Sequence, residues 1–266
     1  MEDWQGPAIW IYNDAEFSDK DFQSLIKLGV GGKSRNDNEN DTRIGKFGIG
    51  FNCAYHITDL PSFVSGKYIA FFDPNAKYLD PSRKRKGNRI NFIEQEFKKR
   101  FPDQCYPYEA IEGCDLEREF RGTLFRLPLR TSRLAEQSEI SNRAVEIQEM
   151  LRLFSNVQGN KEMLFLRNIE SCSLYHMKEQ IPQLIWQAQI NISDADRIIR
   201  QSVTDKPQIY QMDIKIINNE LDTKLSEIWL LCTGGIRDII KTELKDFSNN
   251  KRLKVNIIYL MNLIIF

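Results

Sequence analysis

Three glycines punctuate residues 45–59, whose sequence is GKFGIGFNCAYHITD. Glycine tolerates positive φ and lets a ligand approach the main chain closely. The residues that follow have a helical pattern, and a helix that begins at such a turn points unpaired N–H groups and the positive end of its dipole at a neighbouring ligand. A phosphate group suits that position. The run therefore predicts a phosphate site, although a plain loop-to-helix turn would use the same glycines.

Other residues with obvious chemistry are sparse. Residues 32–34, Gly-Lys-Ser, resemble the end of a Walker A motif, but the first glycine of that motif would fall at Lys27, so the P-loop interpretation fails. Lys33 could still reach a phosphate from a loop, or it could be a solvated loop lysine. His56 and His176 lack a hydrolase or zinc-site motif, so we expect both to be structural.

Three blocks carry a resemblance to known families: residues 6–15 (GPAIWIYNDA), 44–51 (IGKFGIGF) and 121–131 (RGTLFRLPLRT). The second block resembles the second glycine box of the GHKL ATPases and is most similar to the heat-shock chaperone branch. With the other two blocks, the chain resembles the sacsin-like repeat proteins. The resemblance is strong over the first half of the chain and weaker over residues 146–177.

This resemblance implies a chaperone-like ATP-binding module for protein quality control, with ATP and Mg²⁺ as cofactors, client or co-chaperone proteins as partners and a cytoplasmic location. In the GHKL family an aspartate at the position of Asp14 accepts a hydrogen bond from the adenine amino group, and Asn13 is the alternative in register. Thr123 would help hold the water network beside the adenine, or it is an ordinary strand threonine. The implied nucleotide-binding residues are Asn13, Asp14, Lys33, Gly45, Phe47, Gly48, Ile49, Gly50, Phe51 and Thr123.

Two departures from the family pattern support a second hypothesis. The usual D-x-G-x-G is absent, and Asn13 and Asp14 could simply form a turn. GHKL proteins also carry a helix with a Glu/Asn box that polarises the attacking water and binds magnesium, and residues 1–5 leave no room for it before Gly6. We therefore assign no catalytic or metal residue, leave enzymatic activity open, and expect weak ATP binding with negligible hydrolysis. The alternative is a degenerate, nucleotide-free interaction or scaffold module.

The elements that would position these residues follow from hydrophobic periodicity. Ser18, with Asp21 three residues later, is typical of a capping box at the start of a helix. Residues 29–43 are polar and rich in glycine and asparagine, which predicts a mobile loop at the position of the nucleotide lid. Residues 74–122 indicate a long, irregular polar connection, and residues 140–154 a helix. Strands are expected at residues 8–12, 68–73, 124–129, 163–166, 172–175, 210–216 and 228–232.

Together these elements predict the α+β class. The resemblance implies a two-layer α/β sandwich of the Bergerat (GHKL) type over residues 1–131, in which helices cover one face of a mixed sheet. Composition changes near residues 131–138, and residues 132–266 should form a second, sacsin-repeat-like α/β unit. Both units look truncated at the outer ends of the chain. We expect Asp14, Gly48 and Thr123 to line one concavity.

Composition limits the other function classes. The chain has 266 residues, 41% of them hydrophobic, with 37 basic and 37 acidic side chains, so no global charge favours nucleic acid or an anionic membrane. Five cysteines without paired spacing favour a reducing compartment. The longest apolar run, residues 257–266, is too short to span a bilayer. We therefore expect neither a nucleic-acid partner nor a membrane association.

Overall fold

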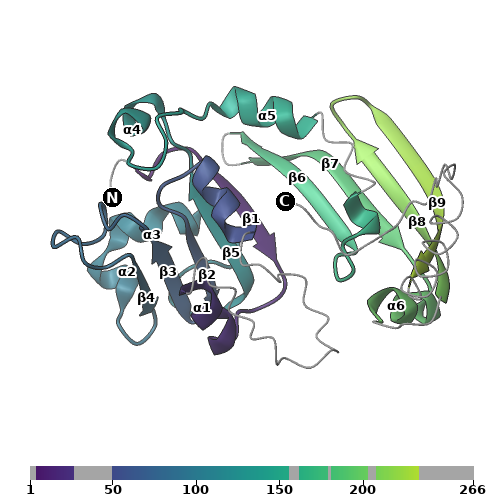
Figure 1. Ribbon diagram of the computed structural model, residues 1–266, viewed down its shortest axis with the longest axis horizontal. Coiled ribbons are helices and arrows are strands. Elements are labelled where there is room, and N and C mark those ends of the chain that lie inside the picture. The colour runs from purple at the N-terminus through teal and green to yellow at the C-terminus, as the bar shows by residue number, and fades with distance from the viewer. Residues whose placement is uncertain (1–3, 27–49, 156–161, 179–180, 203–207, 234–266) are drawn as a thin grey trace, which may run out of the picture. The chain divides into compact units, whose positions relative to one another are not determined.

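The computed structural model describes residues 4–26, 50–155, 162–178, 181–202 and 208–233 (Figure 1). These residues belong to two compact units, the first extending through Arg152 and the second beginning at Leu153. Each unit contains one antiparallel β-sheet with helices packed on it. The predicted α+β class and the second α/β unit are therefore confirmed. Among the described helices, none combines the length and the apolar character needed to cross a bilayer.

The first unit is built on five antiparallel strands in the order β1-β5-β2-β3-β4. The strands expected at residues 8–12, 68–73 and 124–129 are all present, and the third begins earlier than the apolar pattern suggested. The sheet is wholly antiparallel where a mixed one was expected. The strand bounds are β1 Ala8–Asn13, β2 Ser62–Gly66, β3 Tyr68–Phe72, β4 Gly87–Asn91 and β5 Phe120–Pro128.

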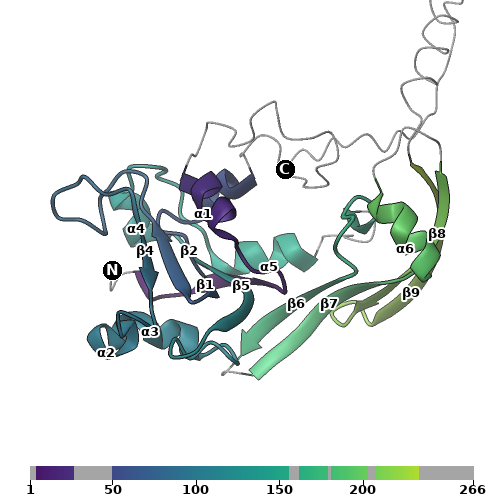
Figure 2. The same cartoon turned by 90° about the horizontal axis from the view of Figure 1, so that it is seen from below.

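Helices cover both faces of this sheet, not one face as expected (Figure 2). The reason lies in the central strands, which bury apolar side chains on both sides: Phe63 faces one side and Val64 the other. Phe22 of α1 packs with Phe63, and Tyr108 of α3 lies in the same cluster as Val64. The helices on the first face are α1 (Asp19–Ile26) and η2 (Gly50–His56), and those on the second are α2 (Phe97–Arg100) and α3 (Pro102–Glu109).

The expectation of an irregular connection over residues 74–122 is therefore wrong in part, because β4, α2 and α3 lie within it. Helix α3 is not predicted because of its prolines. Pro102 is the first residue of the helix and Pro107 lies inside it, so the sequence there is typical of a loop. Only Cys105 and Tyr108 of this helix are buried, which is too few to make a periodic apolar pattern.

The predicted start of α1 is confirmed. The Ser18 backbone N–H donates to Asp21 Oδ2 at 2.9 Å, and the Asp21 backbone N–H donates in return to Ser18 Oγ at 3.4 Å. This reciprocal pair is a capping box. The helix expected after the glycine run is also present, but as the 3₁₀ helix η2. The loop expected at residues 29–43 lies outside the described residues.

The first unit continues past the boundary that the sequence indicates near residues 131–138. After β5 come α4 (Ser132–Gln137) and, further on, α5 (Ile147–Ser155). Ser138 Oγ donates to Asp59 at 2.6 Å, and the Val145 N–H donates to the Arg130 carbonyl at 2.7 Å. These bonds attach the segment to the first sheet, so the change in composition does not coincide with the division between the units.

The second unit is a four-stranded meander in the order β6-β7-β8-β9, with α6 on one face. The alternation expected over residues 210–216 is confirmed, because Tyr210, Met212, Ile214 and Ile216 are buried. The strand expected at residues 163–166 is wrong: a 3₁₀ turn, η3 (Glu162–Leu164), begins there. The bounds are β6 Ser171–Lys178, β7 Ile181–Asn191, α6 Asp194–Gln201, β8 Gln208–Asn218 and β9 Thr223–Thr233.

A buried arginine explains that turn. Arg200 of α6 is 2% exposed, and its Nη2 donates to the carbonyls of Met163, Leu166 and Ile169 at 3.1, 2.5 and 3.1 Å. Three carbonyls from seven consecutive residues can meet at one nitrogen only if the chain curls around it. An extended strand would point them apart.

Candidate functional site

The register of the first sheet places Asn13, Thr123 and Ser65 side by side on three neighbouring strands. Asn13, the last residue of β1, pairs with Thr123 of β5, and Thr123 pairs on its other side with Ser65 of β2. All three belong to the set of positions that includes Phe63 and Phe125, on the face covered by α1 and η2. The register thus places Asn13 beside Thr123, and Asp14 follows directly in the chain. The concavity expected for Asp14, Gly48 and Thr123 stays a prediction, because Gly48 lies outside the described residues.

Two buried hydroxyl groups connect this row to the segment after β1. The Phe17 N–H donates to Ser65 Oγ at 2.8 Å, the Ser65 and Thr123 hydroxyls lie 2.9 Å apart, and Thr123 Oγ1 donates to the Ala15 carbonyl at 2.7 Å. Ser65 is 1% exposed and Thr123 is fully buried. A single direction of donation, from the Phe17 amide through Ser65 and Thr123 to the Ala15 carbonyl, satisfies every group. This hydroxyl chain holds residues 15–17 against the sheet.

Gly122 makes the close approach of β1 possible. Its φ is +91°, and a Cβ placed on it would lie 2.4 Å from the Asn13 carbonyl oxygen. Any other residue would force the end of β1 away from β5 and from Thr123. Nothing in the sequence block around Gly122 assigns it this role directly. A glycine inside an apolar strand was the available signal, since it marks a bulge or a close backbone approach.

Asn13 and Asp14 behave differently. Asn13 Oδ1 accepts a hydrogen bond from the Ala15 N–H at 3.1 Å, which closes an Asx-type turn at the end of β1. Asp14 is exposed and forms no hydrogen bond with the described part of the chain. The turn interpretation therefore holds for Asn13, whereas the Asp14 carboxylate is accessible to a ligand. An exposed carboxylate is an acceptor for an amino group.

The described end of the glycine run packs on the same face. Gly50 begins η2, and Phe51 packs its ring against Phe72 at 4.9 Å and Phe125 at 6.2 Å between ring centroids. Phe51 therefore anchors η2 to the sheet. The other implied nucleotide-binding residues, Lys33, Gly45, Phe47, Gly48 and Ile49, lie outside the described residues.

An ion pair fixes the far end of η2. Arg130 is fully buried and lies 2.6 Å from the carboxylate of Asp59, which is 1% exposed. The same guanidinium donates to the carbonyls of Tyr55 at 2.8 Å and His56 at 3.1 Å, which are the last carbonyls of η2. We call this set the Arg130 clamp. Sequence analysis did not find it, although an arginine directly after an apolar strand was visible in the third block.

The carboxylate of Asp59 is bound on its other side as well. Asp59 Oδ2 accepts hydrogen bonds from Ser138 Oγ at 2.6 Å and from the Tyr78 hydroxyl at 3.2 Å. Burial, followed by the charge of Asp59, raises the pKa of Tyr78. Burial, with a smaller contribution from Asp73, raises the pKa of Tyr55 to about 12. Both phenols are therefore neutral at physiological pH, so neither acts as a phenolate base, and the clamp is a positioning device.

Metal-ligating side chains are not clustered. Within the described ranges, no group of three histidine, cysteine, aspartate or glutamate side chains lies close enough to hold a metal ion. The described candidate residues are one accessible carboxylate, Asp14, two buried hydroxyls, Ser65 and Thr123, and the start of η2.

Comparison with known proteins gives two matches. The family model described as the sacsin domain matches residues 1–188. A human protein, sacsin (Homo sapiens), is 35% identical over 185 residues, which is 65% of this chain and 4% of the human protein. The chain therefore spans only a small part of the length of that relative. The family-model match includes all three sequence blocks and the whole of the first sheet.

Proposed function

The chain belongs to the sacsin domain family, and on that premise we propose that its first unit is an ATP-binding module of the chaperone type. In this proposal the module acts in protein quality control on client or co-chaperone proteins in the cytoplasm. Adenine is bound at the end of β1, and the phosphates are bound at the glycine run that leads into η2. Magnesium would accompany the nucleotide.

One observation carries the proposal: the first and third sequence blocks and the described end of the second, Gly50 and Phe51, meet at one face of one sheet. β1 ends beside Thr123 of β5, and η2 packs through Phe51 onto Phe125 of the same strand. These blocks are far apart in the sequence, and a protein that used them only as local turns would not need them together. Their convergence supports descent from a nucleotide-binding arrangement.

The residues would divide the work by chemistry. The exposed Asp14 carboxylate can accept a hydrogen bond from the adenine amino group. Backbone N–H groups of the glycine run can bind phosphate oxygens, since a helix start offers unpaired donors. Thr123 has already donated its proton to the Ala15 carbonyl, so it could serve a ligand or a water molecule only as an acceptor.

That last point favours a second candidate function, a nucleotide-free interaction module. The hydroxyl chain is complete without any ligand, because Ser65 and Thr123 are bound to each other and to the backbone of residues 15–17. A site whose polar groups are satisfied by the protein gains less from a ligand. A degenerate relative that keeps the fold and has lost the nucleotide would show this closure.

Calorimetric titration of the full chain with ATP and ADP, in the presence of magnesium, separates the two functions. We expect weak, saturable binding that Asp14→Asn reduces at least about tenfold, as loss of a hydrogen bond to a charged group predicts. Glu220→Gln, an exposed carboxylate in the second unit, is the matched control and should bind as the unmodified chain does. Absence of binding at millimolar nucleotide would refute the ATP module and leave the interaction module. Phosphate release measured in the same samples tests the expectation of negligible hydrolysis.

A further inference from the structure

Arg126 is a buried cation without a carboxylate partner. The residue lies on β5, is 6% exposed, and donates from Nη1 to the Trp4 carbonyl at 2.8 Å and from Nη2 to the Gly6 carbonyl at 3.2 Å. Its Nε is buried and has no hydrogen-bond partner. No acidic side chain in the described part of the chain forms an ion pair with it. Burying a charge in this way is costly unless it is paired.

The neighbours of Arg126 compensate the charge only in part. Two carbonyl dipoles and the face of the Trp10 ring, 5.6 Å from the guanidinium carbon, are favourable for a cation. None of them carries a negative charge. Burial accordingly lowers the pKa of Arg126. Arg130, four residues further along, is a buried guanidinium that is paired with Asp59 at 2.6 Å. Arg200 in the second unit is closer to Arg126, since among the described residues it bonds to carbonyls and to no carboxylate.

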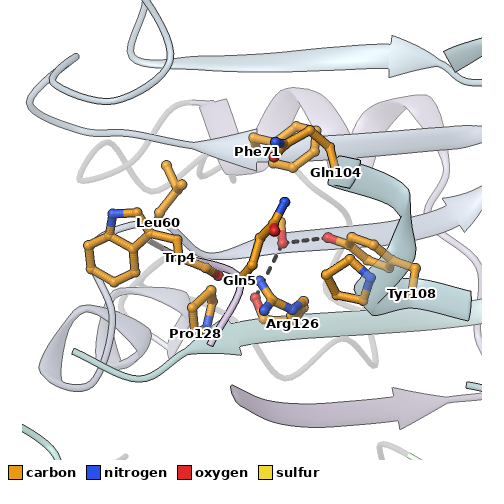
Figure 3. Close-up of a pocket in the computed structure, with 10 residues that line it drawn as sticks. Trp4, Gln5, Leu60, Phe71, Gln104, Tyr108, Arg126 and Pro128 are labelled. Carbon is orange, nitrogen blue, oxygen red and sulfur yellow. Dashed lines mark hydrogen bonds between the residues drawn. The ribbon is translucent and has the colours of Figure 1, made fainter. Parts of the chain in front are cut away.

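A cavity lies directly beside the unpaired group. Figure 3 shows Arg126, Gln5, Gln104 and Tyr108 around a common space that Trp4, Leu60, Phe71 and Pro128 border with apolar surface. About 20 Å³ of this space is open to the centre of a water molecule. That is room for roughly one guest of the size of a water molecule or a monatomic ion.

The cavity also offers a hydroxyl donor. Ser62 Oγ and the Tyr108 hydroxyl lie 2.5 Å apart, and each can donate to the other. If Tyr108 donates, the Ser62 proton has the Arg126 carbonyl as its acceptor at 3.4 Å, and if Ser62 donates, the Tyr108 proton has no acceptor among the described residues. A weak bond at that length leaves the proton available to a guest. The wall therefore combines a cation, a hydroxyl donor and the side-chain amide of Gln104.

We propose that this cavity binds one small monovalent anion of about the size of chloride, held by Arg126 and the Ser62–Tyr108 hydroxyl pair. Its dimensions exclude phosphate and nucleotide. Arg126 points to the face covered by α3, whereas Thr123 of the same strand points to the face covered by α1. The anion site is thus separate from the proposed nucleotide site. By neutralising Arg126 it would stabilise the attachment of residues 4–6 to β5.

Thermal unfolding of the full chain at constant ionic strength tests the proposal. Sodium gluconate, whose anion is too large for the cavity, is replaced stepwise by sodium chloride. A ligand that binds only the folded state raises Tm by mass action, and we expect a saturable rise of about 2–4 °C for the first unit. Arg126→Met should abolish the rise. Arg121→Met, which removes an exposed arginine from the same strand, should retain it.

Two further measurements keep the test decisive. If Arg126→Met does not fold, Gln104→Leu replaces the polar lining residue from α3 by an apolar one and leaves β5 unchanged, and it should weaken the chloride response at least about tenfold in midpoint concentration. Crystals grown in sodium bromide should show an anomalous peak within reach of Arg126. No chloride response in the unmodified chain, or equal responses in Arg126→Met and Arg121→Met, would overturn the proposal, and a water molecule alone would then fill the cavity.

Discussion

The two faces of the first sheet treat buried polar groups differently. On the face covered by α1 and η2, the Ser65 and Thr123 hydroxyls form a closed chain, and beyond the end of β5 the guanidinium of Arg130 is matched by Asp59. On the face covered by α3, Arg126 has no acidic partner among the described residues and adjoins a cavity. A buried polar group needs a partner on either face. A ligand beside Arg126 would supply a missing partner, whereas a ligand at Ser65 and Thr123 would have to displace existing hydrogen bonds.

The largest expected effect on stability is at the buried ion pair of Arg130 and Asp59. Asp59→Ala would leave Arg130 buried without a counter-charge, and removing one partner of a buried ion pair typically costs about 3–5 kcal/mol. Urea unfolding of the first unit measures the change. Glu139→Ala, which breaks the exposed pair with Arg83, is the control and should cost less than about 1 kcal/mol. Equal losses in the two variants would show that the Arg130 clamp is no stronger than a surface pair.

Gly122→Ala should come next. The new Cβ would meet the Asn13 carbonyl at 2.4 Å, and φ at +91° is unfavourable for alanine, so we expect a loss of about 2–3 kcal/mol. Gly6→Ala, where nothing lies within 4 Å of the added methyl, should change stability by less than about 0.5 kcal/mol. Hydrogen exchange should also report faster exchange of the amides along β1 in Gly122→Ala. Unchanged protection of β1 would contradict the role given to this glycine.

Thr123→Val removes one link of the hydroxyl chain at nearly constant volume. The Ala15 carbonyl and the Ser65 hydroxyl each lose a buried partner, which should cost about 1–2 kcal/mol in urea unfolding. Thr223→Val, at the exposed start of β9, provides the matched control. A loss no greater than that of the control would mean that the hydroxyls contribute little, and it would make Thr123 a better candidate for a ligand contact.

The smallest effect on stability is expected at Arg126, which has no ion-pair partner among the described residues. In chloride-free buffer, Arg126→Met should change the free energy of unfolding by less than about 1 kcal/mol, because removal of an uncompensated buried charge offsets the hydrogen bonds lost to the Trp4 and Gly6 carbonyls. A loss as large as that of Asp59→Ala would show that the carbonyls and Trp10 stabilise this guanidinium as effectively as a carboxylate does. The contrast between the two faces would then disappear.

Local signals in the sequence predicted much of the fold. The Ser18–Asp21 capping box, the strand over residues 8–12 and the alternation over residues 210–216 each depend on neighbours within a few positions, and all three are present. The apolar residues 163–166 predict a strand, whereas the structure has a turn there, because the residue that causes the turn, Arg200, lies on a later helix. Similarly, α3 was missed because its prolines carry a loop signal.

The candidate site shows the same division. Asn13, Asp14 and Thr123 could be named from the sequence blocks, and the register pairs Asn13 with Thr123. Ser65 and Asp59 could not, because nothing in their immediate sequence indicates the residues that they bind. Ser65 is bound to Thr123, and Asp59 is bound to Arg130. In both pairs the two residues are far apart in the chain. Partners of this kind become visible only when the strand order is known.

The pairing of β1 with β5 has a consequence for biosynthesis. The hydrogen bond from Thr123 to Ala15 joins residues 108 positions apart, and between them the chain must form β2, β3, β4 and the helices of both faces. Synthesis proceeds from the N-terminus, and contacts between residues distant in sequence form slowly. During synthesis β1 therefore stays unpaired until β5 has emerged. Its apolar residues are then exposed on the nascent chain. Stalling of translation before Pro128 would leave a polypeptide in which β1 lacks part of its hydrogen-bonded partner strand. Such a polypeptide would be a substrate for molecular chaperones.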